Sequence, residues 1–413
     1  MLDPDRTVAE LRELQELTGD ENGAQRVAWT ETWQKAREWL RGKLDGTGAV
    51  ESIDAAGNQW FTLPGQDEQA LLIGGHIDSV PNGGWLDGAL NVMAGAEVLR
   101  RIAAEGTPKL TVRLVNWADE EGARFGRSLF GSSAAAGSMA DQDELRQRKD
   151  ADGVSLPDAI GRFDVDLDTA LEARKELENA AAYLELHIEQ GPVLESLDLP
   201  LGVVLGTFGV ERHQVTFRGQ AAHAGSTPMD KRRDALAGAA KLELEIREIA
   251  KRIGEGAVCT VGGVVTKPGI VTSVVETAEC LLDQRHLDAV QLAEMLDNAK
   301  AASHRFAHEE NLEVDWERIW NIEPILFDER LIELADDSIK EVGGASHRLP
   351  SGPLHDAAEV ARVGVPTVMI FVQSLRGLSH TKLEDTKEEH LELSVQALDR
   401  LADKTLALFG GEA

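Results

Sequence analysis

Four short apolar segments, each followed at once by polar, acidic or glycine-rich residues, most constrain the fold of this chain. We interpret them as strands, and they cover residues 70–75, 110–117, 183–188 and 366–372. Amphipathic helical stretches separate them, and this alternation predicts an α/β fold. Open α/β sheets bind ligands beyond the carboxyl ends of their strands. The chemistry of the protein is therefore expected at that rim of the sheet.

A second series of elements is inserted within the first. Strand-like and helical patterns alternate over residues 209–219, 230–253, 257–267, 278–285, 288–310 and 312–320. The order strand, helix, strand, strand, helix, strand is that of the ferredoxin-like module. We predict a catalytic domain from residues 1–208 and 323–413, with an inserted lid domain over residues 209–322. The charged segment 139–181 is expected to form peripheral helices.

Composition restricts the partners of the protein. The 413 residues exceed one typical core, which favours two domains, and the formal net charge of −30 disfavours binding to nucleic acid or anionic membranes. The first residues carry acids where a secretory signal needs a basic flank and an apolar run, which predicts a cytoplasmic protein. Cys259 and Cys280 have no metal-site spacing and are expected to be buried free thiols.

Two candidate ligands follow the first apolar segment. His76 stands at its end, and a neutral imidazole there is suited to a zinc-like cation, with Asp78 nearby to fix its orientation. A strand-end histidine with an ordinary hydrogen bond explains the same pattern. Asp87 precedes the helical stretch 89–104, so it is either a helix cap or a carboxylate that bridges two metals. Neither residue decides between its two roles alone.

Three consecutive acids, Asp119, Glu120 and Glu121, end the second apolar segment. Buried carboxylates this close repel one another unless cations or protons neutralise them. Neighbouring side chains also point in different directions, so one glutamate can bind a metal while the next reaches a water molecule. An exposed acidic turn is the alternative in so acidic a chain.

His187, within a predicted strand, and His380, in the loop after the last one, complete the pattern. Histidines and acids that recur at strand ends form a ligand set suited to two borderline divalent cations. His304 and His308 lack an accompanying acidic motif and are interpreted as surface residues, and His355 with Asp356 as a structural turn. The chain has no GxSxG elbow, no GxxxxGK[ST] loop and no GxGxxG after a strand.

Five runs of sequence carry a family resemblance. They are HIDSVPNGGWLDG, ADEEGARFGRSLFGS, HIEQGPVLE, GQAAHAGSTPMDKRRDAL and LRGLSH, in that order along nearly the whole chain. Together they resemble the amidase, hydantoinase and carbamoylase branch of the M20 metallopeptidase-like family. This branch includes N-carbamoyl-L-amino-acid hydrolases, β-ureidopropionases and allantoate amidohydrolases.

The resemblance implies a role for each candidate. Asp87 bridges two divalent ions, Glu120 is the general base, and the remaining metal ligands are His76, Glu121, His187 and His380. The ions are zinc, or manganese, cobalt or nickel. His223 reaches the active site and polarises the scissile carbonyl. Three residues match positions that contact substrate in this branch, namely Gln190, Arg212 and Arg285, of which Arg285 suits a carboxylate. Members of the family are usually homodimers joined through the lid.

Two residues depart from the family pattern. Thr272 stands where relatives carry an asparagine that helps to hold the substrate, and a hydroxyl cannot supply both functions of an amide. Leu354 stands where relatives often have glycine, which narrows the wall of the pocket. Both changes leave the metal ligands intact and bear on the choice of substrate.

The sequence thus predicts a metal-dependent hydrolase of linear amide C–N bonds. The expected substrate is an N-carbamoyl-L-amino acid or a related ureido acid with a carboxylate. One alternative is an aminoacylase or peptidase of the same family. The alternative from another class is a non-catalytic metal-binding protein that keeps the fold for ligand capture.

Overall fold

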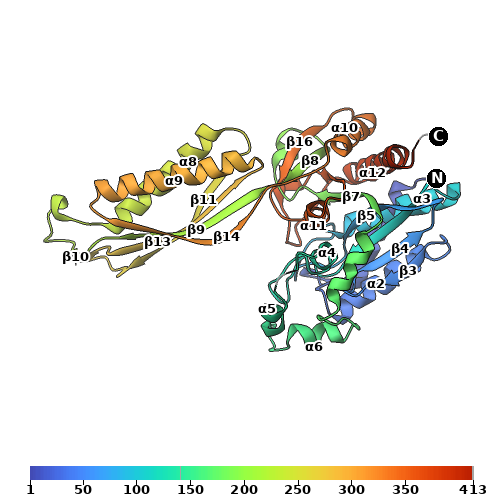
Figure 1. The fold of residues 1–413 in the computed structure, drawn as a ribbon, viewed down its shortest axis with the longest axis horizontal. Helices are drawn as coiled ribbons and strands as arrows, with labels where there is room; N and C mark the ends of the chain where they lie inside the picture. Colours follow the sequence, from blue (N-terminus) through green and yellow to red (C-terminus); the bar gives the residue numbers. More distant parts are fainter. Residues whose placement is uncertain (140, 412–413) are drawn as a thin grey trace. The chain divides into compact units, whose positions relative to one another are not determined.

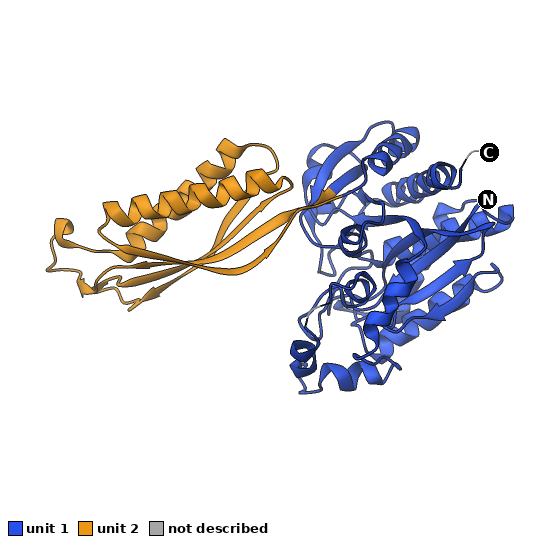
Figure 2. Ribbon diagram, in the orientation of Figure 1, with its two compact units in different colours: residues 1–205, 327–413 blue, residues 206–326 orange. Residues whose placement is uncertain are grey.

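The structure of the protein is a computed structural model that describes residues 1–139 and 141–411. Its contacts divide the chain into two compact units (Figure 2). Unit 1 comprises Met1–Leu205 and Phe327–Ala413, and unit 2 comprises Gly206–Leu326. Each unit has its own cluster of buried apolar side chains. The chain therefore leaves unit 1 once, forms unit 2, and returns.

A nine-stranded mixed sheet forms the centre of unit 1 (Figure 1). Its order is β15-β8-β17-β7-β5-β6-β4-β3, and β16 also pairs with β8. The strands are β3 (Val50–Ile53), β4 (Gln59–Leu63), β5 (Asp67–His76), β6 (Leu110–Trp117), β7 (Ala180–Ile188), β8 (Leu201–Thr207), β15 (Ile325–Leu326), β16 (His347–Ser351) and β17 (Thr367–Val372). A separate small hairpin consists of β1 (Gly19–Asp20) and β2 (Gly23–Ala24).

The four central strands, β17, β7, β5 and β6, are parallel. They contain the four apolar segments predicted from the sequence, and nearly every residue of β7 and β17 is buried. Such continuous apolar strands are typical of parallel sheets that are covered on both faces. Because the strands are parallel, their carboxyl ends lie at one edge, where His76, Trp117, Ile188 and Val372 end their strands.

Helices pack on this sheet in two groups. The helices α3, α10 and α12 contact the central strands, and α11 contacts β5, β7 and β17 together with α4. The helices of unit 1 are α1 (Pro4–Thr18), α2 (Glu31–Leu44), α3 (Ala89–Glu105), α4 (Phe130–Ala136), α5 (Gln142–Gln147), α6 (Leu156–Gly161), α7 (Val193–Ser196), α10 (Glu329–Gly343), α11 (Asp356–Arg362) and α12 (Glu388–Phe409), with the 3₁₀ turns η1 (Ala170–Leu177) and η3 (Leu375–Gly377). The helices predicted over 139–181 are α5, α6 and η1, and residue 140 lies outside the described residues.

Unit 2 is built on a four-stranded antiparallel sheet in the order β11-β13-β9-β14. Helices α8 and α9 lie side by side on this sheet, and their apolar residues form the core of the unit with β9 and β13 (Figure 1). The elements are β9 (Gly209–Arg218), β10 (Ala222–His223), η2 (Met229–Lys231), α8 (Ala235–Ile253), β11 (Val258–Lys267), β12 (Ser273–Val274), β13 (Thr277–His286), α9 (Ala289–Glu309) and β14 (Glu313–Ile322).

The start of α8 differs from the sequence-based expectation. The helix was predicted from Asp230, but it begins at Ala235, because the Asp234 carboxylate caps it by accepting a hydrogen bond from the Leu236 amide at 3.1 Å. Residues 229–231 form a short 3₁₀ turn instead. Asp230 and Asp234 stand four residues apart, and either one fits the pattern of a helix N-cap. The sequence alone does not choose between them.

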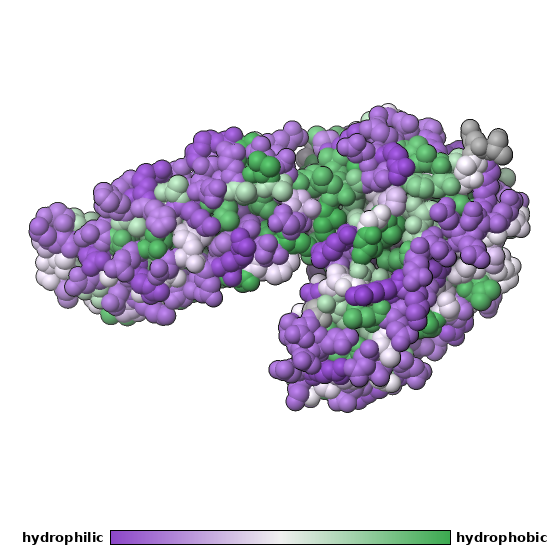
Figure 3. Space-filling model, in the orientation of Figure 1, coloured by the Kyte–Doolittle hydropathy of each residue, from purple (hydrophilic) through white to green (hydrophobic). Residues whose placement is uncertain are grey.

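The surface of the two units is mainly hydrophilic (Figure 3). Hydrophilic residues cover most of both units in the view of Figure 3, with apolar side chains scattered among them. Within the described residues, no helix combines the length and the hydropathy that a membrane span requires. Cys280 is buried, as expected, whereas Cys259 is only half-buried, and both are free thiols.

Candidate metal centre

His76 ends β5 and is buried, with its imidazole fixed in one orientation. Its Nδ1 atom donates to the carbonyl oxygen of Asp78 at 3.1 Å, so Nε2 carries the lone pair. This Nε2 atom lies 3.7 Å from Asp87 Oδ1 and 3.6 Å from Glu120 Oε2. It has no hydrogen-bond partner among the described residues. A buried nitrogen that faces two carboxylates in this way is placed as a metal ligand would be.

His187, near the end of β7, repeats the arrangement. Its Nδ1 atom donates to the carbonyl oxygen of Ile188 at 2.9 Å, and its Nε2 atom lies 3.2 Å from Asp87 Oδ1. Burial works against the charged form, but the hydrogen bond and charge of Asp87 outweigh it and raise the pKa of His187 to about 9. For His76 burial prevails and lowers its pKa to about 4. The two imidazoles therefore share one carboxylate, and a cation binds His187 only when its Nε2 has lost its proton.

Asp87 stands at the centre of the cluster, in the tight turn before α3. Its side chain does not cap that helix, whose N-cap is Gly88 with no side-chain hydrogen bond. Gly88 has a φ of 63°, and a Cβ atom there would lie 2.3 Å from the ring of His76, so only glycine fits. The helix-cap alternative for Asp87 is therefore excluded by the structure.

The two oxygens of Asp87 face two different groups of donors. Oδ1 lies near His76 and His187, whereas Oδ2 lies 3.5 Å from His380 Nε2. His380 Nε2 is also 3.5 Å from Glu121 Oε2. Two sets of donor atoms therefore form, each within 4.8 Å, and both sets include Asp87. The imidazole and carboxylate donors fit two borderline divalent cations with Asp87 as the shared ligand.

The acids after β6 are held in place by Asp78. Its two carboxylate oxygens accept hydrogen bonds from the backbone amides of Glu120 and Glu121 at 3.3 and 3.2 Å. Asp78 was expected to orient His76 through its carboxylate, but its backbone carbonyl accepts that hydrogen bond. Asp119 is buried and accepts a hydrogen bond from the Trp29 indole at 2.8 Å. The acidic segment is therefore not an exposed turn.

The electrostatics of these carboxylates show that the histidines compensate the charge of Asp87, whereas Glu120 and Glu121 are not compensated in this way. Burial, with the charges of Asp356 and Glu121, raises the pKa of Glu120 well above its usual range, and burial with the charge of Asp87 does the same for Glu121. Burial also opposes ionisation of Asp87, but the hydrogen bond and charge of His187 and the neighbouring histidines hold its pKa below the usual range. Divalent cations would remove the repulsion that raises the first two.

Backbone strain gathers at the same site. Asp119, Gln190 and His380 all adopt a φ between 55° and 57°, in the left-handed region that non-glycine residues avoid. Such conformations cost about 1–3 kcal/mol each and persist where surrounding contacts fix them. Gln190 shows one of these contacts, since its amide donates to Asp87 Oδ2 at 2.8 Å and to Ser379 Oγ at 3.1 Å.

Two residues near the site were misinterpreted from the sequence. His355 and Asp356 were expected to form a structural turn, but both are buried, and the His355 ring centroid is 4.4 Å from that of His187. Neither carboxylate oxygen of Asp356 has a hydrogen-bond partner in the described part of the chain. Burial and the charge of His187 lower the pKa of His355 well below its usual range, so it is neutral. Sequence-adjacent residues gave no sign of these long-range contacts.

The remaining candidates lie in unit 2. His223 is exposed in β10, and its Nδ1 accepts a hydrogen bond from the Gly225 amide at 3.1 Å. Thr272 is also exposed, and its carbonyl oxygen accepts from the Ala224 amide at 2.8 Å. Arg212 and Arg285 lie on neighbouring strands, and both guanidinium groups bind Asp283 at 2.8 Å. An ion-pair cluster of two arginines and one aspartate results.

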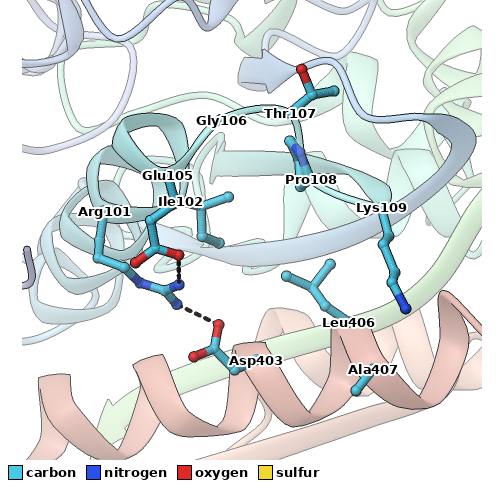
Figure 4. A pocket seen from close by; sticks show the side chains of 10 residues that line it. All are labelled: Arg101, Ile102, Glu105, Gly106, Thr107, Pro108, Lys109, Asp403, Leu406 and Ala407. Carbon is cyan, nitrogen blue, oxygen red and sulfur yellow. Dashed lines mark hydrogen bonds and ion pairs between the residues drawn. The ribbon is translucent and has the colours of Figure 1, made fainter. Parts of the chain in front are cut away.

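A cavity of about 420 Å³ elsewhere in unit 1 offers a contrasting environment (Figure 4). Residues at the carboxyl end of α3 and on α12 line it. Its Arg101 guanidinium is held by Glu105 at 2.9 Å and by Asp403 at 2.7 Å. The charge in this cavity is thus already neutralised, and the cavity contains none of the candidate site residues.

Comparison with known proteins identifies the family. The model of peptidase family M20/M25/M40 matches residues 72–404. The chain belongs to this family. It is 36% identical over 394 residues to an N-carbamoyl-L-amino acid amidohydrolase of Geobacillus stearothermophilus, which covers 94% of this chain and 95% of that protein. It is 32% identical over 380 residues to an allantoate amidohydrolase of Escherichia coli, with 91% of each chain covered.

Solved structures give the same result for this M20 family member. A hydantoinase/carbamoylase family amidase from Burkholderia multivorans superposes with a TM-score of 0.89 at 29% sequence identity. The match covers 100% of this chain and 99% of that one. The predicted family is therefore confirmed, and so is the mixed α/β fold.

Proposed function

We propose that this chain is a metal-dependent amidohydrolase that cleaves a linear amide C–N bond of an N-carbamoyl-L-amino acid or a related ureido acid. The observation that carries the proposal is the position of Asp87, whose two oxygens serve two sets of donor atoms. Glu120 lies beside these sets with its carboxylate 3.6 Å from the first histidine. Relatives with the names N-carbamoyl-L-amino acid amidohydrolase and allantoate amidohydrolase support the substrate class.

The protein side of the mechanism follows from this geometry. Divalent cations held by His76, Asp87 and His187 and by Asp87, Glu121 and His380 would supply Lewis acidity for the substrate carbonyl and for a water molecule. Glu120 takes a proton from the attacking water and delivers it to the leaving nitrogen. The Glu120 carboxylate is buried beside the two donor sets, which keeps it out of bulk solvent during this transfer. Hydrolysis of a carbamoyl group then yields the amino acid, ammonia and carbon dioxide.

Unit 2 supplies further substrate-binding groups in this proposal, beside Gln190 of unit 1. Its strand and helix order and its sheet order support a ferredoxin-like lid domain. Arg285 binds the substrate carboxylate as a bidentate donor, Arg212 assists it, and His223 donates to the developing oxyanion. By the family resemblance, two chains form a homodimer through this lid. Closure of the lid excludes water from the reacting groups.

The second candidate function is hydrolysis of an N-acyl amino acid, which Thr272 and Leu354 favour. Both residues depart from the carbamoylase pattern. Thr272 removes the amide of the usual asparagine, and Leu354 fills space that the usual glycine leaves open, so the pocket has fewer hydrogen-bonding groups and less room for the amide of a carbamoyl group. A panel of N-carbamoyl, N-acyl and ureido acids separates the two functions when it is tested on protein reconstituted with each metal in turn. Release of ammonia and carbon dioxide indicates a carbamoyl group, whereas release of a carboxylic acid indicates an acyl group.

The same experiment tests catalysis against a purely binding role. Metal analysis by mass spectrometry accompanies the turnover assay on the full chain. Bound cations with turnover support the hydrolase, and bound cations without turnover on any member of the panel support ligand capture. A protein that binds no divalent cation contradicts the proposed function.

A further inference from the structure

Glu384 connects the two loops that carry Asp87 and His380. Its Oε1 atom accepts hydrogen bonds from the backbone amides of Leu86 and Asp87, both at 3.0 Å. Its Oε2 atom accepts from the Ser379 hydroxyl at 2.9 Å. The Ser379 Oγ atom is in turn 2.8 Å from Asp87 Oδ2. The buried Glu384 carboxylate thus holds the backbone at Asp87 and also the side chain of Ser379, which precedes His380.

The loop around Asp87 is shaped to receive this carboxylate. A Cβ atom at Gly84 would lie 2.1 Å from both the Cδ and the Oε1 atoms of Glu384. Only glycine therefore leaves room for the carboxylate against the loop. Glu384 itself is buried, with 2% of its surface exposed. A buried carboxylate is costly unless its oxygens accept hydrogen bonds, and here three donors meet it.

His380 depends most on such support. Its side chain is 52% exposed, whereas that of His187 is 1% exposed. Its backbone also adopts a φ of 57°, and no strand or helix includes it. His76 and His187, by contrast, are fixed within strands and by hydrogen bonds of their own Nδ1 atoms. Without an external constraint, the loop of His380 would lose its fixed position relative to Asp87.

We propose that Glu384 is a positioning residue that aligns the His380 loop with Asp87 and so completes the donor set of Asp87, Glu121 and His380. This inference rests on the proposed function, because it assigns a cation to that set. Glu384 faces backbone amides and a hydroxyl, so it acts through the neighbouring ligands. Loss of Glu384 should lower the affinity for the cation at this donor set. The affinity of the donor set of His76, Asp87 and His187 should change little.

Zinc titration of the full-length apoprotein tests the inference. The wild-type protein should bind two Zn²⁺ ions per chain in competition with a chromophoric chelator. In Glu384→Ala one of these affinities should fall about 10- to 100-fold, the effect typical of a lost partner of a metal ligand. Glu384→Gln should retain both, because its amide oxygen can accept from the two backbone amides and its NH₂ group can donate to Ser379. Asp385→Ala is the matched control, since the neighbouring Asp385 carboxylate accepts its hydrogen bond from the Trp85 indole, at 3.3 Å, and its backbone carbonyl, which accepts from the Leu375 amide, is kept by the substitution.

Two further variants make the outcome specific. In Gly84→Ala the added methyl group displaces the Glu384 carboxylate while Glu384 itself is kept. The affinity for the same zinc ion should therefore fall, which distinguishes a loss of positioning from a folding defect of Glu384→Ala. Adding Glu384→Ala to His380→Ala should cause little additional loss of zinc, because that donor set is already broken. If both Glu384→Ala and Gly84→Ala bind two zinc ions with unchanged affinity, the positioning role of Glu384 is wrong. The proposed function is not affected by that result. A wild-type protein that binds none of zinc, manganese, cobalt and nickel overturns the proposed function as well.

Discussion

The two units contain charged clusters of opposite design. Around Asp87 in unit 1, the acids, His76 and His187 have buried side chains, and several of their donor atoms have no hydrogen-bond partner within the described residues. Around Asp283 in unit 2, the side chains are only partly buried, and two guanidinium groups bind one carboxylate. In the first cluster the histidines stabilise the charge of Asp87, whereas Glu120 and Glu121 are left with burial and mutual repulsion. In the second, hydrogen bonds from two guanidinium groups hold one carboxylate in its charged form.

The pKa shifts of the two clusters show what this difference means. Burial and mutual repulsion raise the pKa values of Glu120 and Glu121, whereas hydrogen bonds from Arg285 and Arg212 overcome burial and lower the pKa of Asp283. In the absence of cations, Glu120 and Glu121 are therefore held toward their neutral forms, whereas the two guanidinium groups hold Asp283 in its charged form. A hydrolase of anionic amides needs one cluster of each kind.

Replacement of Glu120 by glutamine should have the largest effect on activity. The amide keeps the volume of the side chain but cannot accept the proton of water, so kcat should fall by about 10²- to 10⁴-fold. The zinc content should stay at the wild-type value, because Glu120 is not assigned as a ligand. Single-turnover kinetics and metal analysis of the same preparation measure both quantities. Full turnover in a variant that still binds metal contradicts the assignment of Glu120.

The second largest effect is expected on stability, when the metal is removed. Cations that bind only the folded state stabilise it by about 2.7 kcal/mol per site at 100 times the dissociation constant. Chelation should therefore lower the melting temperature, and added zinc should restore it. His76→Ala serves as the control, since chelation should shift its melting temperature less. An identical melting temperature with and without chelator would show that the buried acids do not need cations.

Replacement of Arg285 by lysine tests the other cluster. Lysine keeps the charge but loses the bidentate geometry, so KM for a substrate with a free carboxylate should rise about tenfold, which corresponds to roughly 1.4 kcal/mol. The change in kcat should be smaller. The methyl ester of the same substrate is the control, because its KM should be insensitive to the substitution. Equal effects on acid and ester would remove Arg285 from carboxylate recognition.

Sequence reasoning reached the parts of the site that depend on local patterns. The apolar runs before His76 and Glu120 identified parallel strands, and parallel strands place their carboxyl ends together. The structure accordingly brings His76, Asp87, Glu121, His187 and His380 into two overlapping groups. Which glutamate is the ligand and which the base came from family resemblance, because adjacent residues of one loop look alike in sequence.

The remaining features depend on contacts between distant segments. Glu384 meets the amides of Leu86 and Asp87 across almost 300 residues, and His355 meets His187 through packing of α11 on β7. No local period or spacing encodes such contacts. Gly84 is the one signal that was present, because a glycine in a loop can mark a close approach of another group, but the sequence does not show which group approaches.

The smallest expected effect concerns the stability that Asp283 provides. Its pKa in the folded protein lies below the usual value, so its contribution is complete above the unfolded pKa of about 3.9 and is lost as the pH falls through the folded pKa. Asp283→Asn should therefore destabilise the protein by about 0.5–1 kcal/mol at pH 7, because solvent partly screens the cluster, and by less at pH 3. Thermal denaturation at both pH values measures the difference.

Asp315→Asn is the control for this prediction. Asp315 and its partner Arg218 are exposed, so the loss of their ion pair should cost almost no stability. An equal penalty at pH 7 and pH 3 would mean that Asp283 stabilises unit 2 by packing, and the contrast between the two charged clusters would then reduce to a difference in burial.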